Sequence, residues 1–533
     1  MDTGTLNYCW SQVLVAGLQS AGVRQAVISP GSRSTPLTLA LLRQPGMTST
    51  VIVDERCAAF FALGIAKASR MPVVVVATSG SAPANWLPAV IEADQAGVPL
   101  ILISADRPPE LQSVGANQTI DQSRLFASQT RAMHLLAPPH ADFDPACLHH
   151  LASQVVETAC WPHPGPVHIN QPFREPLLPT DSPASPQLPP IAVSRSVLQP
   201  DALACQALLD DLRGRRGLIV CGELAVGDAE GAAIRRLADH LGCAILAEPL
   251  SNLRFGQPRD AAICANYLSW LPDEPAAEPF RLEWVLRFGS FPVTRKLQNF
   301  LASIRQHLWV DPWPRMSDPQ HRLTHLIRAT PAQFVEAAIG DSTPHPELGL
   351  RDLCLQLDQQ TPVAGFWPVT TLIDAAPAGS SLFIGNSLAI RQLDAASGRG
   401  DKPLHFFGNR GASGIDGNLS TALGIAQVQG SVIALVGDLT CQHDIGALAS
   451  SHGLNAIIVV LNNGGGGIFA TLPQAALPEF ETGWRTPQML DFALAAHAFG
   501  LSYQRAESAE NLAGALKLAI FSGGPQMIEV RGF

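Results

Sequence analysis

Short apolar runs rich in Val, Ile and Leu alternate with helical patterns along the whole chain. In chain order they are QAVIS (25–29), TVIVD (50–54), PVVVVAT (72–78), PLILISA (99–105), GLIVCG (217–222), CAILAE (243–248), SLFIG (381–385), VIALVG (432–437) and AIIVVLN (456–462). Continuous apolar strands of this kind are typical of parallel sheets that helices cover on both faces. The pattern therefore predicts an α/β protein built from doubly wound parallel sheets.

Two stretches interrupt this alternation. Residues 174–200 are rich in proline and have little periodicity, so we expect an extended linker over the surface. Residues 340–350 (GDSTPHPELGL) form a shorter break of the same kind. A chain of 533 residues is also too long for one hydrophobic core. We predict three domains, at 1–180, 190–340 and 345–533.

The first and third predicted domains resemble each other. In the first, one strand ends at Thr78-Ser79-Gly80 and the next at Ser104-Ala105-Asp106. In the third, one strand ends at Gly437-Asp438-Leu439 and the next at Asn462-Asn463. A helix of similar length separates the strands in both cases, which indicates a duplicated βαβ architecture. The alternative is that any two doubly wound domains look alike at this level.

Composition and charge narrow the class of protein. The formal net charge is −10 and no basic stripe is visible, which argues against a nucleic-acid partner. The ten cysteines include no CxxC pair, so we expect reduced thiols in the cytosol. No apolar run is long enough to insert into a membrane, and the segment MDTGTLNYCW lacks the features of a secretory signal. We expect a cytoplasmic enzyme or binding protein.

Polar residues stand where several of the predicted strands end. They are Ser32-Arg33, Glu55-Arg56 and Asp106-Arg107 in the first domain, and Asn386-Ser387, Asp438 and Asn462-Asn463 in the third. Open parallel sheets bind ligands beyond the carboxyl ends of their strands. The repetition over two similar domains predicts one site that the two share.

Asp438 and Asn463 form the most specific motif. A Gly-Asp turn followed about two dozen residues later by Asn-Asn is the diphosphate-binding motif of thiamine-diphosphate enzymes. Mg²⁺ prefers hard oxygen ligands, which a carboxylate, a carboxamide and the backbone carbonyl of Gly465 would supply. The glycines 464–467 would let the backbone approach the phosphates. The alternative is a glycine-rich turn between strand and helix that binds nothing.

Glu55 is the second candidate for thiamine chemistry. That chemistry needs a carboxyl group hydrogen-bonded to the aminopyrimidine ring, and Glu55 opens an apolar helical pattern, CAAFFALGIAKAS. The helix N-terminus favours the carboxylate and burial favours the neutral acid. A glutamate that only complements a helix dipole is the alternative, and the metal motif favours the catalytic interpretation.

With these motifs in place, the sequence resembles the family of 2-succinyl-5-enolpyruvyl-6-hydroxy-3-cyclohexene-1-carboxylate (SEPHCHC) synthases of menaquinone biosynthesis. The segments that carry the resemblance are ISPGSRSTPL (28–37), VDERCAAFFALGIAKAS (53–69), TSGSAPAN (78–85), ISADRPPEL (103–111), GANQTIDQ (115–122), GPVHINQPFREPL (165–177), GNSLAIRQLD (385–394), GNRGASGIDG (408–417) and GDLTCQHDIGAL (437–448). The resemblance spans nearly the whole chain and is weakest in the middle domain.

The resemblance implies a pyrimidine-binding domain, a middle domain and a diphosphate-binding domain, in that order. It implies active sites between the first domain of one subunit and the third of another, so we expect at least a homodimer and, beyond that, a homotetramer. The implied cofactors are thiamine diphosphate and Mg²⁺, with Mn²⁺ as an alternative. The implied transferase reaction decarboxylates 2-oxoglutarate and adds the resulting carbanion equivalent to isochorismate.

The resemblance also implies roles for individual residues. Glu55 would activate the cofactor, Ile415 would keep its two rings folded together, and Asp438, Asn463 and Gly465 would hold the metal. Further contacts to the cofactor would come from Thr78, Ser79, Gly80, Asn117, Ser387, Gly414, Gly437 and Ile468. Contacts to the substrates would come from Ser32, Arg33, Arg107, Asn117, Gln118, Arg295, Lys296, Arg391 and Arg410, with Arg33, Arg107, Gln118, Ser387, Arg391 and Arg410 also acting in catalysis. Guanidinium groups match the carboxylates of two dianionic substrates, although a surface ion pair is the more common role of a single arginine.

Some positions depart from the family pattern. Leu439 stands where the general thiamine motif has glycine, a change that the family tolerates. The middle domain has Arg295-Lys296 where the family typically has Lys-Arg, which keeps the charge in the reverse order. The last predicted strand lies in PQMIEVRGF and few residues follow it, so we expect an abbreviated C-terminal tail compared with the family.

Two other functions are compatible with these residues. Another thiamine-diphosphate 2-oxoacid decarboxylase or carboligase would share Glu55, Asp438 and Asn463 but would not require the four arginines. A non-catalytic nucleotide-binding regulatory protein could use the same scaffold, although the presence of Glu55 argues against it.

Overall fold

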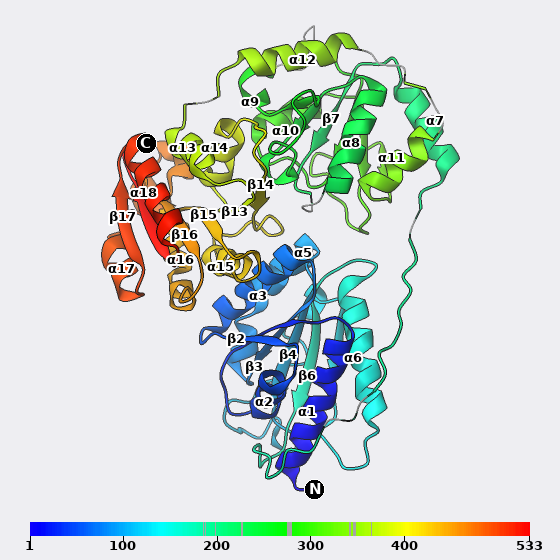
Figure 1. The fold of residues 1–533 in the computed structure, drawn as a ribbon, viewed down its shortest axis with the longest axis vertical. Helices are drawn as coiled ribbons and strands as arrows, with labels where there is room; N and C mark the ends of the chain where they lie inside the picture. Colours follow the sequence, from blue (N-terminus) through cyan, green and yellow to red (C-terminus); the bar gives the residue numbers. More distant parts are fainter. Residues whose placement is uncertain are drawn as a thin grey trace.

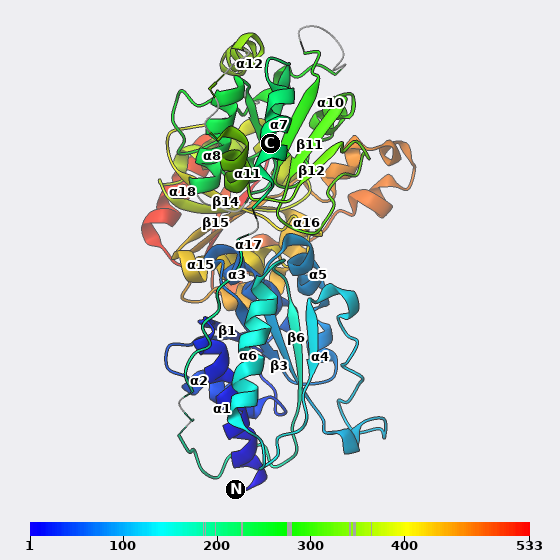
Figure 2. The same cartoon turned by 90° about the vertical axis from the view of Figure 1, so that its right-hand side faces the viewer.

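The computed structural model of the chain describes residues 1–184, 186, 188–197, 199–224, 228–273, 280–340, 343–344, 348–363 and 365–533. These residues form three α/β domains, each built on a six-stranded parallel sheet (Figures 1 and 2). The predicted fold class, three doubly wound parallel sheets, is confirmed.

The first domain has the sheet order β2-β1-β3-β4-β6-β5. Its elements are α1 (Thr3–Ser20), β1 (Gln25–Ile28), α2 (Thr35–Arg43), β2 (Thr48–Val51), α3 (Glu55–Ser69), β3 (Val73–Ala77), α4 (Ser81–Ala84), α5 (Leu87–Ala96), β4 (Leu100–Asp106), β5 (Ala132–Leu135), α6 (Pro145–Cys160) and β6 (Val167–Pro172). All residues of β3, β4 and β6 are buried, as their continuous apolar runs predict.

The edge strand β2 differs from its prediction. The run TVIVD was expected to be a buried strand, but β2 covers Thr48–Val51, and Val51 and Val53 are exposed. An edge strand has a neighbour on one side only, so β-branched residues there can face solvent. The apolar run therefore predicted the strand correctly and its burial and limits incorrectly.

The middle domain has a different connectivity. Its sheet order, β9-β8-β7-β10-β11-β12, is that of a Rossmann-type doubly wound sheet. Its elements are α7 (Ala202–Leu212), β7 (Gly217–Cys221), α8 (Asp228–Leu241), β8 (Ile245–Ala247), β9 (Ile263–Cys264), α9 (Tyr267–Trp270), β10 (Trp284–Phe288), α10 (Arg295–Ala302), β11 (Gln306–Val310), β12 (His325–Ile327), α11 (Pro331–Ile339) and α12 (Leu348–Gln360). Leu350 and Cys354 of α12 pack into the core of this domain, although the predicted domain limit at 345 assigns them to the third.

The third domain repeats the strand order of the first, as β14-β13-β15-β16-β18-β17. Its elements are α13 (Trp367–Ala375), β13 (Ser380–Ile384), α14 (Leu388–Ala396), β14 (Leu404–Phe407), α15 (Asn418–Gln429), β15 (Val432–Gly437), α16 (Asp438–His443), β16 (Ala456–Leu461), α17 (Phe492–Ala498), β17 (Ser502–Ala506), α18 (Ala509–Ser522) and β18 (Gln526–Val530). Strand for strand the connectivity equals that of the first domain, which supports the predicted duplication.

The path of the linker can be followed in Figure 1. The described residues of 174–200 contain no helix or strand and run along the outside of the molecule from the first to the middle domain. The short break at 340–350 lies partly outside the described residues. The exact limits 1–180, 190–340 and 345–533 stay predictions.

Helices α3 and α15 join the first and third domains. A Cβ atom on Gly64 of α3 would lie 2.0 Å from the carbonyl oxygen of Thr421, and one on Gly424 of α15 would lie 2.0 Å from that of Phe61. The two backbones thus meet where neither helix has a side chain, and one apolar core includes both helices and the sheets behind them. None of the helices among the described residues combines the length and the apolar character needed to cross a bilayer.

Candidate active site

A pocket of about 130 Å³ lies at the carboxyl ends of β13, β15 and β16 in the third domain. Its lining includes seven of the predicted site residues, namely Ser387, Ile415, Gly437, Asp438, Asn463, Gly465 and Ile468. Strand order explains this gathering, because β13, β15 and β16 are neighbours and their ends meet at one edge.

Asp438 follows β15 directly and is 8% exposed. Its carboxylate accepts hydrogen bonds from the backbone N–H groups of Leu439 (2.8 Å) and Gly465 (2.7 Å). Burial raises the pKa of Asp438, and these backbone donors oppose the rise by stabilising the carboxylate. The turn that contains Leu439 in place of glycine therefore still orients the acid by its backbone.

The two asparagines after β16 have different surroundings. The Asn462 amide donates to Glu529 of β18 at 2.6 Å. The Asn463 side-chain oxygen is buried and has no hydrogen-bond partner among the described residues. A buried acceptor without a partner is costly unless a ligand satisfies it. Of the two asparagines, Asn463 is thus the one whose oxygen is available to a ligand.

Gly465, Gly466 and Gly467, which follow Asn463 closely in the chain, line the same pocket. Gly464 and Gly465 have φ of 76° and 122°, a region that favours glycine. A Cβ atom on Gly465 would lie 2.2 Å from the carbonyl oxygen of Arg485. Arg485 in turn donates to the carbonyl of Asn463 at 2.6 Å. Sequence reasoning missed Arg485, which holds this turn from the short helical segment Glu481–Arg485.

The oxygen atoms around this pocket fit a hard divalent cation. They are the Asp438 carboxylate, the unpartnered Asn463 oxygen and the backbone carbonyl of Gly465, which also accepts from the Gly467 N–H at 2.8 Å. Mg²⁺ prefers such oxygen ligands and commonly shares them with substrate or cofactor phosphates. The glycine backbone leaves space for a phosphate group beside the cation.

Ser387 lines the pocket at the N-terminus of α14. Ser387 has φ of 67°, a strained conformation for a residue other than glycine. Arg391, one turn into the helix, donates to the carbonyl of Ser387 at 2.6 Å. Burial lowers the pKa of Arg391, and the nearby charge of Arg410 lowers it further. The guanidinium groups of Arg391 and Arg410 therefore lie near each other, and their like charges repel.

The loop 408–417 carries Arg410, Gly414 and Ile415. Arg410 donates to the Asn386 side-chain oxygen, and the Asn386 amide donates to the carbonyl of Gly414, each at 2.6 Å. Asn386 was recognised as a strand-end residue but not as the link between this loop and β13. Ile415 lines the pocket directly.

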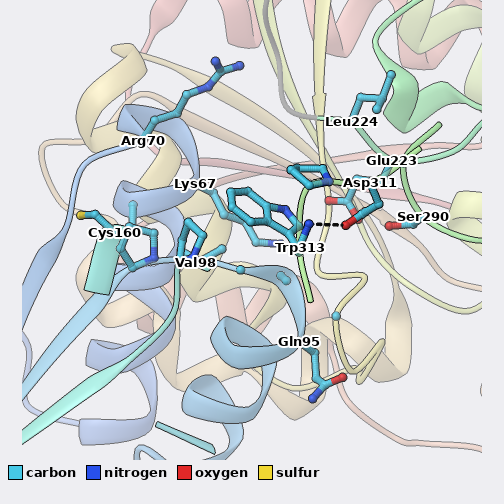
Figure 3. A pocket seen from close by; sticks show the side chains of 18 of the residues that line it. Lys67, Arg70, Gln95, Val98, Cys160, Glu223, Leu224, Ser290, Asp311 and Trp313 are labelled. Carbon is cyan, nitrogen blue, oxygen red and sulfur yellow. Dashed lines mark hydrogen bonds between the residues drawn. The ribbon is translucent and has the colours of Figure 1, made fainter. Parts of the chain in front are cut away.

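Arg410 is not part of the lining of that pocket, but it borders two other cavities. The larger, of about 620 Å³, lies at the junction of the three domains and includes Lys67 and Trp313 (Figure 3). The smaller, of about 40 Å³, contains Glu223, Glu248 and Asp394. Burial, followed by the neighbouring Asp394, raises the pKa of Glu248. The middle domain thus places buried carboxyl groups near Arg410, which sequence reasoning did not predict.

A second cluster lies at the carboxyl ends of β1, β3 and β4 in the first domain. Arg33 is 6% exposed and donates to the carbonyl of Phe173 at 2.9 Å and to Glu175 at 2.7 Å, while its Nε has no partner among the described residues. Arg107 donates to the Ser79 hydroxyl. Burial lowers the pKa of Arg107, and the charge of Arg33 adds to the effect. This domain also pairs two arginines.

Gln118 completes the first-domain cluster. Its side-chain amide donates to the backbone carbonyl of Ser79, and its backbone carbonyl accepts from the Ser79 hydroxyl, each at 3.0 Å. Thr78 and Gly80 flank Ser79, and the Gly80 N–H donates to Gln122 at 2.9 Å. Ser32 and Asn117 lie nearby in the chain with exposed side chains.

Like the first-domain cluster, the predicted site residues Glu55, Arg295 and Lys296 are not part of the lining of the third-domain pocket. Glu55 is the first residue of α3 and is half-buried, but the pocket is lined only by residues from 386 onward. Arg295 is exposed at the start of α10, and the Lys296 ammonium lies 3.8 Å from Asp273. One chain therefore holds two separate parts of the predicted site.

Three family models match successive parts of the chain. They are described as thiamine pyrophosphate enzyme, N-terminal TPP binding domain (residues 10–125), middle domain of thiamine pyrophosphate (residues 193–360), and thiamine pyrophosphate enzyme, C-terminal TPP binding domain (residues 392–530). With the three parallel sheets and the pocket, these matches define a thiamine-diphosphate-binding enzyme.

Curated relatives narrow this class. A protein of Dechloromonas aromatica (strain RCB) named 2-succinyl-5-enolpyruvyl-6-hydroxy-3-cyclohexene-1-carboxylate synthase is 53% identical over 99% of both chains. Proteins with the same name from Geobacillus kaustophilus (strain HTA426) and Roseiflexus castenholzii (strain DSM 13941 / HLO8) are 40% and 38% identical, each over 98% of this chain and over 94% and 96% of their own length. The chain belongs to the SEPHCHC synthase family, as its motifs predicted.

Proposed function

We propose that the chain decarboxylates 2-oxoglutarate and joins the remaining four-carbon unit to isochorismate, giving SEPHCHC and CO₂. The observation that carries this proposal is the pocket at Asp438 and Asn463 in a chain that is 53% identical to a named SEPHCHC synthase. The proposal includes thiamine diphosphate and Mg²⁺ as cofactors, with Mn²⁺ as a possible substitute for the metal.

Asp438, Asn463 and Gly465 would hold the metal through a carboxylate, a carboxamide oxygen and a backbone carbonyl. The unpartnered Asn463 oxygen supports this assignment, since a cation would supply the missing partner. Gly437, Gly414, Ser387 and Ile468 would bind the remainder of the cofactor from around the same pocket.

Thiamine diphosphate, when bound, supplies the carbanion-stabilising chemistry that decarboxylation and carbon–carbon bond formation require. The Glu55 carboxyl group would exchange a proton with the aminopyrimidine ring of the cofactor. Ile415 would press on the cofactor from the pocket side. Thr78, Ser79, Gly80 and Asn117 would contact the pyrimidine end from the first domain.

The arginine pairs would bind the substrate carboxylates. Arg33 and Arg107 in the first domain would take those of isochorismate, with Ser32 and Gln118 as polar neighbours. Arg391 and Arg410 in the third domain would take the distal carboxylate of 2-oxoglutarate. Partial burial supports these roles, because a poorly solvated guanidinium gains most from an anionic partner. Arg295 and Lys296 would approach from the middle domain.

We further propose that the active site forms between two subunits. Within one chain, Glu55 is not part of the lining of the pocket that contains Asp438, so a second copy would bring the first domain to it. A homodimer is the smallest assembly that satisfies this requirement, and a homotetramer of two such dimers is the expected state. The ten free cysteines support a reducing, cytoplasmic location.

Complementation between inactive variants tests the shared site. Glu55→Gln and Asp438→Ala subunits should each be inactive alone. With random pairing after co-expression, about half of the dimers would be mixed, and each mixed dimer would have one of its two sites intact. The mixture should therefore have about a quarter of wild-type activity. A site formed within each subunit would regain no activity, which would refute the shared site.

The reaction itself is tested with purified protein, thiamine diphosphate and Mg²⁺. We expect CO₂ release from 2-oxoglutarate and, with isochorismate added, the mass of SEPHCHC. Release of an aldehyde without any isochorismate adduct would favour another 2-oxoacid decarboxylase. A protein that is not even stabilised against heat by the cofactor and Mg²⁺ would exclude a thiamine enzyme altogether.

A further inference from the structure

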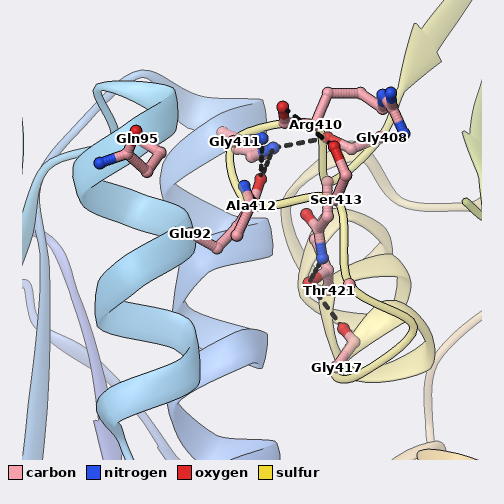
Figure 4. A network of polar contacts seen from close by, with 12 residues as sticks. Glu92, Gln95, Gly408, Arg410, Gly411, Ala412, Ser413, Gly417 and Thr421 are labelled. Atoms are coloured by element: carbon pink, nitrogen blue, oxygen red, sulfur yellow. Dashed lines mark hydrogen bonds and ion pairs between the residues drawn. The ribbon is translucent and has the colours of Figure 1, made fainter. Parts of the chain in front are cut away.

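A buried carboxylate of the first domain holds a loop of the third domain in the same chain. Glu92 lies on α5 and is 2% exposed. It accepts hydrogen bonds from the backbone N–H groups of Gly411 (2.9 Å) and Ala412 (2.6 Å), as Figure 4 shows. Both donors belong to the loop 408–417, which carries Arg410 and Ile415.

Lys67 of α3 completes this contact. Its ammonium lies 3.3 Å from the Glu92 carboxylate and donates to the carbonyl of Gly408 at 2.5 Å. The side chains of Lys67 and Glu92 are 8% and 3% exposed. A pair of charges this deeply buried is costly unless hydrogen bonds satisfy it. Here most of the partners are backbone groups of the loop, so the pair and the loop depend on each other.

The loop also approaches α5 too closely for a side chain. A Cβ atom on Gly411 would lie 2.7 Å from the carbonyl oxygen of Glu92 and 2.9 Å from the backbone nitrogen of Ala96. The backbone of the loop therefore rests directly on the helix. This close approach gives Glu92 access to two successive N–H groups.

The residues on either side of this contact belong to the candidate site. Arg410 directly precedes Gly411 and donates to Asn386, a residue of the pocket lining. Gly414 and Ile415 follow two and three residues after Ala412, and the carbonyl of Gly414 accepts from the Asn386 amide. The loop is thus held by α5 on one side and by Asn386 on the other.

We propose that Lys67 and Glu92 are positioning residues that fix the loop 408–415, and with it Arg410, for substrate binding. This inference rests on the proposed function, because it takes Arg410 as a ligand of the 2-oxoglutarate carboxylate. The first domain would then act twice, supplying Glu55 to a partner's site and stabilising the third-domain loop of its own chain.

The test compares Glu92→Gln with Asp94→Asn. Asp94 lies on the same helix and pairs with Arg131, with side chains 13% and 15% exposed. Its side chain accepts hydrogen bonds from Arg131 and Gln95 rather than from the loop. Glutamine matches glutamate in size, but its amide group presents N–H where the loop also presents N–H. If the competent loop position falls to roughly a tenth of the molecules, the KM for 2-oxoglutarate should rise about tenfold. Asp94→Asn should lose about as much thermal stability as Glu92→Gln but leave the KM for 2-oxoglutarate close to that of the wild type.

Hydrogen exchange gives a readout that is independent of activity. In the full-length protein, peptides that contain Gly411 and Ala412 should exchange faster in Glu92→Gln than in wild type or Asp94→Asn. The Mg²⁺ dependence of cofactor binding should change little, because the proposed metal ligands Asp438, Asn463 and Gly465 lie on other turns. If Glu92→Gln does not fold, Lys67→Met carries the test, since it removes the contact to Gly408 and keeps the carboxylate.

The outcomes separate this inference from the proposed function. Unchanged exchange and unchanged KM in Glu92→Gln and Lys67→Met would overturn the positioning role. If Arg410→Ala has no effect on 2-oxoglutarate binding, the assignment of Arg410 fails instead. A rise in KM with Arg410→Ala but not with the Glu92 and Lys67 variants would leave the proposed function intact and refute only the inference.

Discussion

The first and third domains share a strand order but present different chemistry at equivalent positions. Register identifies these positions, because Ser104 pairs with Asn170 in the first sheet and Val460 pairs with Glu529 in the third. Asp106 then corresponds to Asn462, and Arg107 to Asn463. The same register on the neighbouring strands makes Ser79 the counterpart of Asp438.

In each domain an amide–carboxylate hydrogen bond joins the ends of two neighbouring strands, but the two groups stand on opposite strands in the two domains. In the first, the Asn170 amide donates to the Asp106 carboxylate at 2.8 Å. In the third, the Asn462 amide donates to the Glu529 carboxylate at 2.6 Å. The carboxylate and the amide have exchanged strands, and the hydrogen bond that fixes the end of the fourth strand is kept.

The residue that follows this support differs in its chemistry. The first domain has Arg107, a cation bonded to Ser79, whereas the third has Asn463, whose free oxygen lines the same pocket as Asp438. One sheet edge suits a carboxylate ligand and the other suits a metal ion with a phosphate. A duplicated scaffold thus provides two complementary halves of a site by changing a few residues at strand ends.

Glu55 should show the largest effect of any single change. Glu55 is the first residue of α3, whereas the first residue of α15, the corresponding helix of the third domain, is Asn418. Glu55→Gln keeps the size of the side chain but cannot exchange a proton, so turnover should fall by about 10²- to 10⁴-fold. Steady-state assays with calorimetry should show lost turnover with cofactor binding retained. Near wild-type turnover would contradict the assignment.

Asp438→Ala tests the metal half of the comparison. It removes the only charged protein ligand proposed for Mg²⁺, and affinity for the cofactor should fall by roughly 100-fold. Calorimetric titration at several Mg²⁺ concentrations measures the change. Ser79→Ala, the equivalent change in the first domain, should leave the Mg²⁺ dependence of binding intact. Equal losses in both variants would refute the division between the two sheets.

The arginine pairs should separate the two substrates. Arg107→Ala should raise the KM for isochorismate while decarboxylation of 2-oxoglutarate continues, and Arg391→Ala should impair the 2-oxoglutarate step first. Each change removes a charge-assisted contact, which corresponds to a roughly 10- to 150-fold effect. Single-turnover CO₂ release without isochorismate distinguishes the steps. Equal impairment of that release would show that the pairs do not divide the substrates.

His168 provides the smallest test, on stability alone. It lies on β6 at the position that Met527 occupies on β18, and burial lowers its pKa to about 4. The unfolded chain, with an ordinary histidine pKa near 6.5, binds more protons between about pH 4 and 6.5, so stability falls as the pH falls through that range. The contribution lost between about pH 7 and 5 is roughly 2 kcal/mol. His168→Met should flatten this part of the pH profile in denaturant unfolding, whatever its effect at neutral pH, and an unchanged slope would contradict the role of His168.

The fold and the third-domain pocket were largely predictable from the sequence. Buried parallel strands produce long apolar runs, and Asp438 and Asn463 stand directly where two of those runs end. The edge strand β2 was less predictable, because an apolar run does not distinguish a central strand from an edge. Alternation of strands and helices indicated the duplication, and the register of the sheets then identified its equivalent positions.

Other site residues have no pattern that a sequence could show. Arg485 contacts only the backbone of the glycine turn, which lies about twenty residues earlier in the chain. Glu92 lies in the interior of a helix, where one glutamate resembles any other. The loop residues that it binds follow more than three hundred residues later in the chain. Contacts of this kind depend on how the domains pack, which strand and helix periodicity does not encode.

The contact between α3 and α15 has a consequence for synthesis of the chain. Cys57–Ala66 of α3 are all buried, and part of their cover comes from α15, which is about 360 residues further along. A ribosome adding about 5–20 residues per second needs roughly 20–70 s to reach Gly424 after Gly64. During that interval an apolar helix surface of the nascent first domain has no partner from its own chain. The newborn protein thus presents a surface that suits chaperones until its last domain emerges.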